Sequence, residues 1–433
     1  MTEYRSAQPA TAAVTGTGAQ GASYRYLVLG LLLLVYIFNF ADRMLLGVMA
    51  APIKADLGLT DGQLGLLGGT AFALLYATAG VPIGWLADRR SRSWIITLAL
   101  SIWSGFTALC GLASGFAMLF LARVGVGVGE AGGVAPSYSM IADYFPPHQR
   151  ARALGVYSFG IPIGGAAGLA FGGVIADVFD WRVAFISIGV IGMLLAPIFK
   201  WFVRDPVRGG TEHTAVMAPP KVAEAFRIIA RKPTFWLISF GSAMGSTASY
   251  GIAFWIPSFY VRSFDMPLSQ VTLWYAAVVL LSGISGIWLG AWLGDRFGPR
   301  RPATYLAIPM FALAASVPFF ALAVLATSPL VSLALLFVPS MLGMMGFGTV
   351  LTAVQHVVPA SLRSTSSALF LFINNLIGLG LGSAVLGFIS DALLRSYGQQ
   401  SLRYALLAGS VFYVLAALLY FFASRRAAKD WEV

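Results

Sequence analysis

Four charged side chains interrupt apolar stretches of this sequence: Asp42 and Arg43 in one stretch, Arg123 and Glu130 in another. A charge at the centre of a bilayer costs roughly 2.5 to 3.5 kcal/mol on insertion scales, so such residues face a protein interior or a water-filled cavity and pair with one another. On a helix, Arg123 and Glu130 point to one side, about 10 Å apart along the axis. The adjacent Asp42 and Arg43 must point in different directions. We expect a buried charge cluster.

Two carboxylates beside two guanidinium groups can load and release a proton. Desolvation favours the neutral carboxyl form and a nearby arginine favours the charged form, so moving the arginine changes the proton affinity. We interpret Asp42 and Glu130 as proton-coupling residues, and Arg43 and Arg123 as residues that hold a carboxylate or meet an anionic group of a substrate. An ion-pair network that only joins two helices is the alternative, although a buried ion pair is weak evidence for stability.

The carboxyl-terminal half has no comparable buried charge, and its intramembrane polar groups are uncharged. Asn374 and Tyr250 are the candidates there for binding a substrate. The polar groups around them can line a pathway or can bond backbone carbonyls, and both interpretations stay open. The three histidines and the single cysteine, Cys110, form no nucleophilic or metal-ligand constellation. We expect no catalytic site, no metal and no cofactor.

A third set of charges follows two apolar stretches in a repeated pattern. Gly-Trp-Leu-Ala-Asp-Arg-Arg-Ser-Arg at 84–92 recurs as Ala-Trp-Leu-Gly-Asp-Arg-Phe-Gly-Pro-Arg at 291–300. Charges at such helix ends can pair across two halves of a protein or can cap helix termini. We interpret the set as conformational latches: Asp88, Arg89, Arg92, Asp143, Asp295 and Arg296. Asp143 is the expected partner of Arg89 or Arg92.

The composition defines the elements that must hold these residues. Of the 433 residues, 58% are hydrophobic and only 10% are charged, whereas soluble domains carry about 25% charge. A water-soluble globular protein is therefore excluded. Twelve stretches are long enough to span a bilayer at ~20 residues each; they start near Tyr26, Leu64, Trp94, Ala117, Arg152, Val183, Phe235, Ser269, Pro302, Pro329, Thr365 and Leu402.

The basic residues predict the orientation of these spans. With a cytoplasmic amino terminus, 21 of the 28 lysines and arginines lie on the inside and five on the outside. By the positive-inside rule both termini are cytoplasmic, and we expect a multi-pass protein of the cell inner membrane. The net charge of +11 forms no basic face, so a nucleic-acid partner is not expected. We expect a monomer whose partners are the bilayer, protons and a small amphipathic substrate.

An internal repeat divides the chain. Besides the Asp-Arg runs, Pro146-x-x-x-Arg150 matches Pro359-x-x-x-Arg363, and Val-Ile-Ala-Asp177 matches Phe-Ile-Ser-Asp391. Matched landmarks in one order indicate two parallel six-helix halves that rock about a central site. The expected units are a disordered cytoplasmic tail at 1–25, a six-helix bundle at 26–203, a cytoplasmic linker with a short amphipathic helix at 204–232, a second bundle at 233–424 and a tail at 425–433.

Glycines recur four residues apart in the fourth, fifth and eighth expected spans. Small residues at this spacing allow helices to approach closely in lipid. The faces can pack statically or can slide during a transport cycle, and the spacing fits both. The runs are Gly125-Gly129-Gly133, Gly160-Gly164-Gly168-Gly172 and Gly286-Gly290-Gly294.

The Gly-x-Leu-Ala-Asp-Arg-x-x-Arg run ending at Arg92 resembles the loop signature of the major facilitator superfamily. The runs Asn-Phe-Ala-Asp-Arg at 39–43, Arg-x-Gly-x-Gly-x-Gly-Glu-Ala at 123–131 and Phe-Gly-Ile-Pro-Ile-Gly at 159–164 resemble the spinster branch. The first resemblance covers essentially the whole chain, and the second rests on the amino-terminal half. The element Gly160-x-Pro162-x-Gly164 also resembles a fifth-helix motif of antiporters. The short loops without glycosylation sequons point to a bacterial member.

The resemblance implies the major facilitator fold and, from the eukaryotic spinster proteins, export of sphingosine-1-phosphate or lysophospholipids. We therefore expect an all-α integral membrane protein with twelve transmembrane helices in two pseudo-symmetric six-helix bundles. Its expected activity is proton-coupled export of an amphipathic lipid-like substrate. A proton-coupled symporter of small organic anions is the first alternative. A membrane-embedded lipid enzyme is the second, and the missing catalytic constellation argues against it.

Overall fold

The computed structural model describes residues 22–87, 89–206 and 222–431, and within them it contains helices and no strands. Asp88 and the residues 1–21, 207–221 and 432–433 lie outside the described part, as do most of the expected amino-terminal tail and most of the expected linker. The helices of the first half are α1 (Ala22–Val48), α2 (Ala50–Leu57), α3 (Asp61–Gly68), α4 (Thr70–Ala87), α5 (Arg92–Cys110), α6 (Phe116–Glu130), α7 (Val134–Tyr144), α8 (Pro147–Ser158), α9 (Gly160–Val178) and α10 (Trp181–Phe202).

The second half follows a short helix, α11 (Val222–Ala230), which lies where an amphipathic helix was predicted. Short 3-10 segments lie between several of its helices, and one π segment, η3, joins α17 to α18. The elements are α12 (Pro233–Phe264), α13 (Leu268–Phe297), η1 (Gly298–Arg300), α14 (Thr304–Leu325), α15 (Pro329–Met344), α16 (Gly346–His356), η2 (Ala360–Leu362), α17 (Arg363–Ile373), η3 (Asn374–Leu379), α18 (Gly380–Tyr397), η4 (Gly398–Gln400), α19 (Ser401–Gly409) and α20 (Val411–Asp430).

Ten helical runs in the described residues are long and apolar enough to cross a membrane. One of them, Thr365–Asp430, covers two expected spans, and α12 supplies the expected span near Phe235. The predicted twelve-helix membrane fold is therefore confirmed. The ends differ from expectation: α1 begins at Ala22, before Tyr26, and α20 continues to Asp430 through most of the expected carboxyl-terminal tail.

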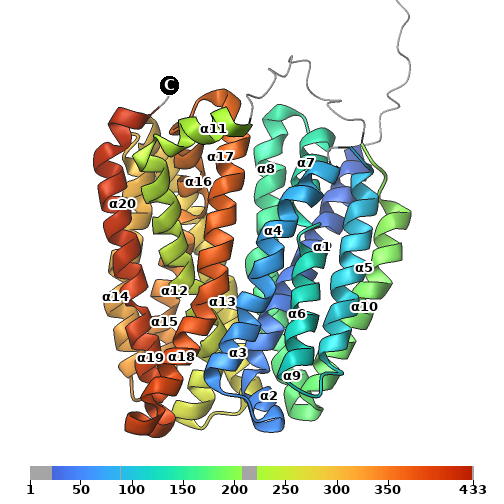
Figure 1. Ribbon diagram of the computed structural model, residues 1–433, viewed down its shortest axis with the longest axis vertical. Coiled ribbons are helices and arrows are strands. Elements are labelled where there is room, and N and C mark those ends of the chain that lie inside the picture. The colour runs from blue at the N-terminus through green and yellow to red at the C-terminus, as the bar shows by residue number, and fades with distance from the viewer. Residues whose placement is uncertain (1–21, 88, 207–221, 432–433) are drawn as a thin grey trace, which may run out of the picture.

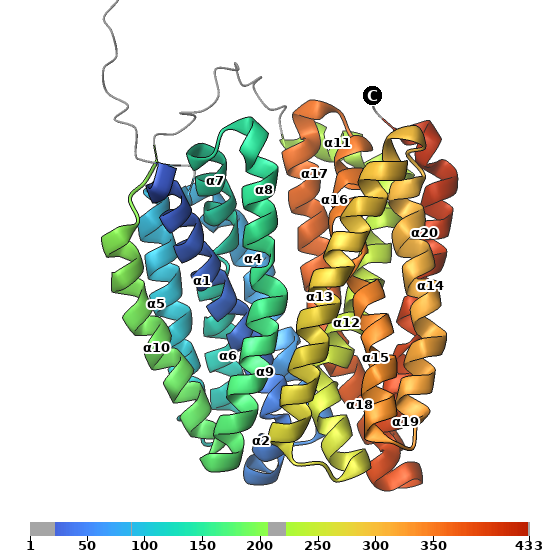
Figure 2. The same ribbon diagram turned by 180° about the vertical axis from the view of Figure 1, so that it is seen from behind.

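The spans gather into two bundles, α1–α10 and α12–α20, that stand side by side (Figures 1 and 2). The start of α1, the end of α20 and the short helix α11 lie at one end of the molecule. We call this end the termini side and the opposite end, where α2 and α19 lie, the far side. The bundles meet mainly through two helix pairs, α3 with α18 and α9 with α13.

Glycines permit the closest helix contacts, as their spacing predicted. On α9, a Cβ added at Gly164 or Gly168 would lie 2.5 Å from the Ile37 carbonyl oxygen or 2.4 Å from the Ala41 carbonyl oxygen of α1. On α13, a Cβ at Gly290 would lie 2.1 Å from the Met345 carbonyl oxygen. Real Cβ atoms do not approach backbone this closely, so these helices pack at separations that only glycine allows. The α1–α9 contact fixes the part of α1 that carries Asp42 and Arg43.

Candidate functional site

The four predicted charges come together in the interior of the first bundle. Asp42 and Arg43 lie on α1, and Arg123 and Glu130 lie on α6. Asp42 and Arg123 are each 1% exposed and Glu130 is 0% exposed. Within the described residues, every buried charged side chain belongs to the first half, as the sequence indicated.

The two α1 charges use different partners, because neighbours on a helix point in different directions. The Arg43 Nε donates to Glu130 Oε2 at 2.7 Å and forms an ion pair. Thr107 of α5 donates its hydroxyl to Asp42 Oδ2 at 2.8 Å. Glu130 is thus bound by a charged guanidinium and Asp42 by a neutral hydroxyl, so the two carboxylates have different environments.

Aromatic rings surround the Arg43 guanidinium. Its central carbon lies 4.8 Å from the ring centre of Phe72, 4.7 Å from that of Tyr76 and 5.0 Å from that of Phe40. The Arg123 guanidinium lies 5.5 Å from the Phe72 ring. Ring faces attract cations, most strongly where water is excluded. These rings were not predicted from the sequence, because an aromatic residue in an apolar span carries no signal that separates a cation partner from a lipid contact.

The cluster leaves several buried polar atoms without a hydrogen-bond partner among the described residues. They are Asp42 Oδ1, Arg43 Nη2, Arg123 Nε, Arg123 Nη1 and Glu130 Oε1. An unpaired buried polar group costs free energy, and each such group in a native structure calls for an explanation such as a catalytic role, a water or an ion. The guanidinium groups hold unused donors for an anion and the carboxylates hold unused acceptors for a proton.

A cavity connects this cluster to the second bundle. Its enclosed volume is about 30 Å³, room for little more than one water. Arg43 and Arg123 enter it from the first half, and Tyr250 from α12 faces them. The wall is otherwise apolar or small: Met44, Gly47, Gly68, Phe72, Leu169, Ala253, Phe254, Pro257, Leu379 and Ser383.

The two polar candidates of the second half have different positions. Tyr250 lines the cavity beside the arginines, whereas Asn374 is not among its lining residues. Asn374 begins η3, a π-helical segment, and its Oδ1 accepts hydrogen bonds from Ser242 and Ser246 of α12, both at 2.8 Å. Short π segments inside α-helices occur often at functional sites. Asn374 therefore joins η3 to α12 near the site, without lining the cavity.

The predicted latch residues lie at the termini side. Arg92 of α5 forms an ion pair with Asp143 of α7, one of the two partners considered for Asp143, and both residues belong to the first half. Arg89 follows α4, is exposed and donates to the Trp85 carbonyl of that helix at 3.1 Å. Asp295 and Arg296 are exposed, and in the described part of the chain no ion pair involves either. The proposed latch residue Asp88 lies outside the described residues.

A polar network on the far side was not predicted from the sequence. Its centre is Asp61 of α3, which is 1% exposed and binds Arg262 of the second half. Lys54 and Arg262 are two of the five basic residues counted on the outside, and the sequence assigns them no further role, because topology signals and ion-pair partners look alike in a sequence. A useful signal was nevertheless present, since the repeat landmark Asp391 belongs to the same network.

The family model described as "Major Facilitator Superfamily" matches residues 32–380. An MFS-type efflux pump of Mycolicibacterium smegmatis is 31% identical over 95% of this chain and 95% of its own length. Protein spinster homolog 1 of Mus musculus is 28% identical over 86% of this chain and 74% of its own length.

A crystal structure of a bacterial homologue of the human lysosomal transporter Spinster is similar to the whole chain. It is in an inward-facing, unoccupied conformation and superposes with a TM-score of 0.85 at 32% identity, over 95% of this chain and 99% of that one. The nucleoside transporter NupG, at 14% identity and a TM-score of 0.72, shares the fold. The fold, the family model and these relatives agree, and the chain therefore belongs to the spinster branch of the Major Facilitator Superfamily, a family of transporters and not of enzymes.

Proposed function

We propose that the protein is a proton-coupled secondary active transporter that exports an amphipathic, lipid-like substrate by alternating access. The observation that carries the proposal is the cavity between the bundles, which is lined by two buried arginines with unused N–H donors and is otherwise mostly apolar. An amphipathic anion matches both properties, because its charged group meets the guanidinium groups and its chain meets apolar surface.

Glu130 and Asp42 are the proton-coupling residues of this proposal. The bond from Arg43 to Glu130 competes with protonation of Glu130, since the guanidinium favours the charged carboxylate. Protonation of Glu130 therefore frees Arg43, and deprotonation binds it again. Proton binding is thereby linked to the position of one arginine that lines the cavity.

The direction and topology belong to the same proposal. Both termini are cytoplasmic by the distribution of basic residues, so the far side is extracytoplasmic and the membrane is the cell inner membrane. A relative described as an efflux pump supports export. Residues 26–203 and 233–424 are the two units that rock, with the linker at 204–232 between them.

A symporter of small organic anions is the second candidate, because the two arginines suit any anion and the cavity has a volume of only about 30 Å³ in this conformation. A sugar acid or dicarboxylate needs hydrogen-bonding partners for its other oxygens. Tyr250 and Ser383 are the uncharged polar side chains in the cavity wall. This small number favours a substrate with an apolar body.

Flux into proteoliposomes tests the proposal. The purified protein is reconstituted with or without a pH gradient and offered lysophospholipids, phosphorylated sphingoid bases and small organic anions. We expect gradient-dependent movement of a lipid-like substrate, and none in vesicles that contain the Glu130→Gln variant. Gradient-driven flux of small anions alone would favour the symporter, and chemical conversion of a lipid would overturn transport as the activity.

A further inference from the structure

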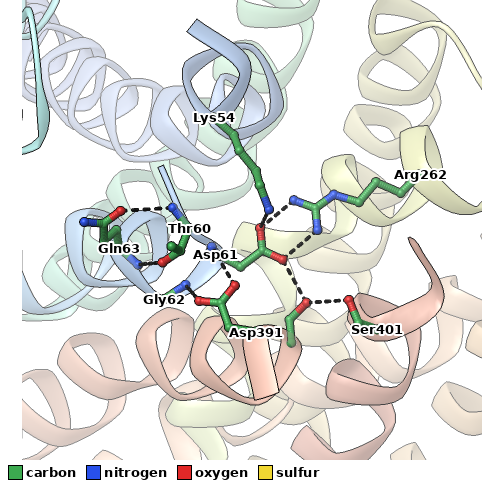
Figure 3. Close-up of polar contacts among 9 residues, drawn as sticks. Lys54, Thr60, Asp61, Gly62, Gln63, Arg262, Asp391 and Ser401 are labelled. Carbon is green, nitrogen blue, oxygen red and sulfur yellow. Dashed lines mark hydrogen bonds and ion pairs between the residues drawn. The ribbon is translucent and has the colours of Figure 1, made fainter. Parts of the chain in front are cut away.

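The far-side network joins the two bundles through a buried ion pair. Arg262 of α12 donates through both terminal nitrogens to the two carboxylate oxygens of Asp61, each at 2.7 Å. Lys54 of α2 donates to Asp61 at 2.6 Å, and Ser390 of α18 donates to it at 2.8 Å. In Figure 3, Lys54 reaches the Asp61 carboxylate from above and Arg262 reaches it from the right. The Asp61 side chain is thereby bound from both halves of the protein.

A second carboxylate holds the backbone of the same helix. Asp391 of α18 accepts hydrogen bonds from the backbone N–H groups of Asp61 at 3.0 Å and Gly62 at 2.7 Å (Figure 3). Thr60 and Gln63 complete this end with a capping box. The first N–H groups of a helix have no partner within it and carry partial positive charge, so a carboxylate there is stabilising. Part of the cap of α3 thus comes from the opposite half.

The internal repeat places a related contact on the other side of the interface. Asp177, which matches Asp391 in the repeat, ends α9 and accepts a hydrogen bond from Ser269 in the first turn of α13. The pair α9–α13 corresponds to α18–α3 when the two halves are exchanged. Asp177 is exposed and accepts from one hydroxyl, whereas Asp391 is partly buried and accepts from two backbone groups. The two contacts are related in position and unequal in strength.

The backbones of α3 and α18 lie in close contact next to the Asp391 cap, so the contacts of Asp391 and Asp61 across the interface form and break together. A Cβ at Gly65 would lie 2.3 Å from the Ser383 carbonyl oxygen, and one at Gly387 would lie 2.3 Å from the Asp61 carbonyl oxygen. Backbones in such close contact separate as a unit. When α3 and α18 part, Asp391 loses its N–H donors and Asp61 loses Arg262 together.

We propose that Asp391 and Asp177 are repeat-related positioning residues of the far-side gate, each holding the first turn of a helix of the opposite half, with Asp391 and the Asp61–Arg262 pair forming the stronger closure. The inference rests on the proposed function in that the two halves must rock apart. Opening of the far side then requires release of both contacts, and the contacts bias the resting protein toward the termini-side-open state.

Distance measurement between spin labels tests this assignment without any substrate. Cysteines replace the exposed far-side residues Ala55 of α2 and Gln399 of η4 in a Cys110→Ala background, and double electron–electron resonance is recorded in nanodiscs. We expect Asp391→Asn to increase the population with a long label-to-label distance about fivefold or more, the scale of a typical coupling between two states. Ser269→Ala removes one hydroxyl contact and should give a smaller increase in the same direction.

Asp205→Asn is the matched control. Asp205 also caps a helix, since it accepts from the Ser93 backbone N–H of α5 at 2.9 Å, but α5 belongs to the first half and Asp205 follows α10, so this contact does not join the two bundles. Loss of that cap should lower thermal stability and leave the far-side distances unchanged. Unchanged distances in both Asp391→Asn and Ser269→Ala would overturn the gate assignment. That result would not decide whether the protein transports a substrate, because the distance measurement needs neither substrate nor proton gradient. The flux experiment tests transport separately.

Discussion

The two halves share a fold and differ in what they place at the middle of the membrane. The first half holds Asp42, Arg43, Arg123 and Glu130 in a buried cluster, whereas α12 and η3 of the second half present hydroxyl, phenol and amide groups. Buried charge is costly in a bilayer and uncharged polar groups are much less so. A repeated structure therefore does not imply a repeated function.

The difference suggests a division of labour in the proposed transporter. Charge chemistry, and with it proton coupling, is concentrated in the first half. The second half contributes shape, one phenol at the cavity and the π segment at Asn374. Substitution of the carboxylates of the first half should change the coupling of transport to the proton gradient, and substitution of the phenol in the second half should change substrate affinity alone.

The largest effect is expected at Glu130. Glu130→Gln keeps the shape of the side chain and removes its proton-dependent charge, so gradient-driven flux should fall at least about tenfold, equivalent to ~1.4 kcal/mol. Asp42→Asn should act in the same direction. Flux with and without a pH gradient measures both. Asp265→Asn is the control, because Asp265 is exposed and its positive φ of 51° suits asparagine. Full gradient-driven flux in both cluster variants would remove the coupling assignment.

The next largest effects are expected at the two arginines, and substitution of each should change a different property of transport. Lysine keeps the charge but loses the planar fork of the guanidinium. Arg43 is bound to Glu130, whereas Arg123 retains two nitrogens without partners, so Arg123→Lys should raise KM by about tenfold, or ~1.4 kcal/mol. Arg43→Lys should weaken the dependence of flux on the gradient. Concentration series at fixed pH gradients distinguish the two effects, and equal, negligible changes would leave neither arginine assigned to substrate.

A smaller change is expected at Tyr250 in the second half. Tyr250→Phe removes one hydroxyl from the cavity wall, and the net loss of one hydrogen bond is about 0.5 to 1.5 kcal/mol. KM should rise a few-fold while the gradient dependence stays the same. Asn374→Ala should leave KM nearly unchanged and lower thermal stability, because Ser242 and Ser246 lose their acceptor. A coupling defect in Tyr250→Phe would contradict the division between halves.

The smallest effect concerns a carboxylate far from the cluster. Partial burial raises the pKa of Asp205, but hydrogen bonds from Ser91 and Ser93 outweigh this and hold the pKa below its ordinary value. A lowered folded-state pKa stabilises the protein above the unfolded pKa of about 3.9, and the contribution is lost as pH falls through the lowered value.

Asp205→Asn should therefore cost at most about 1 kcal/mol near neutral pH, since the site is exposed. The difference from the parent protein should shrink below pH 4. Thermal unfolding in detergent at several pH values measures it. Transport should be unchanged, and a loss of transport would show that a cap within one half also acts in the cycle.

The sequence by itself determined the membrane class, the twelve spans, the repeat and the family, because apolar length and matched motifs are local properties of the chain. It also singled out Asp42, Arg43, Arg123 and Glu130, since charge inside an apolar span is conspicuous wherever it occurs. The expected glycine contacts followed from spacing alone. These features need no knowledge of which helices are neighbours.

Only the tertiary structure decided which side chains the charged residues bind. Arg43 binds Glu130 while Asp42 binds Thr107, and Arg92 binds Asp143 within one half. The far-side network was invisible because Asp61, Arg262 and Asp391 are distant in sequence and each looks like an ordinary charge at a helix end. A hydrogen bond depends on positions to within a fraction of an ångström. Helix packing across the two bundles sets those positions, and no local pattern encodes it.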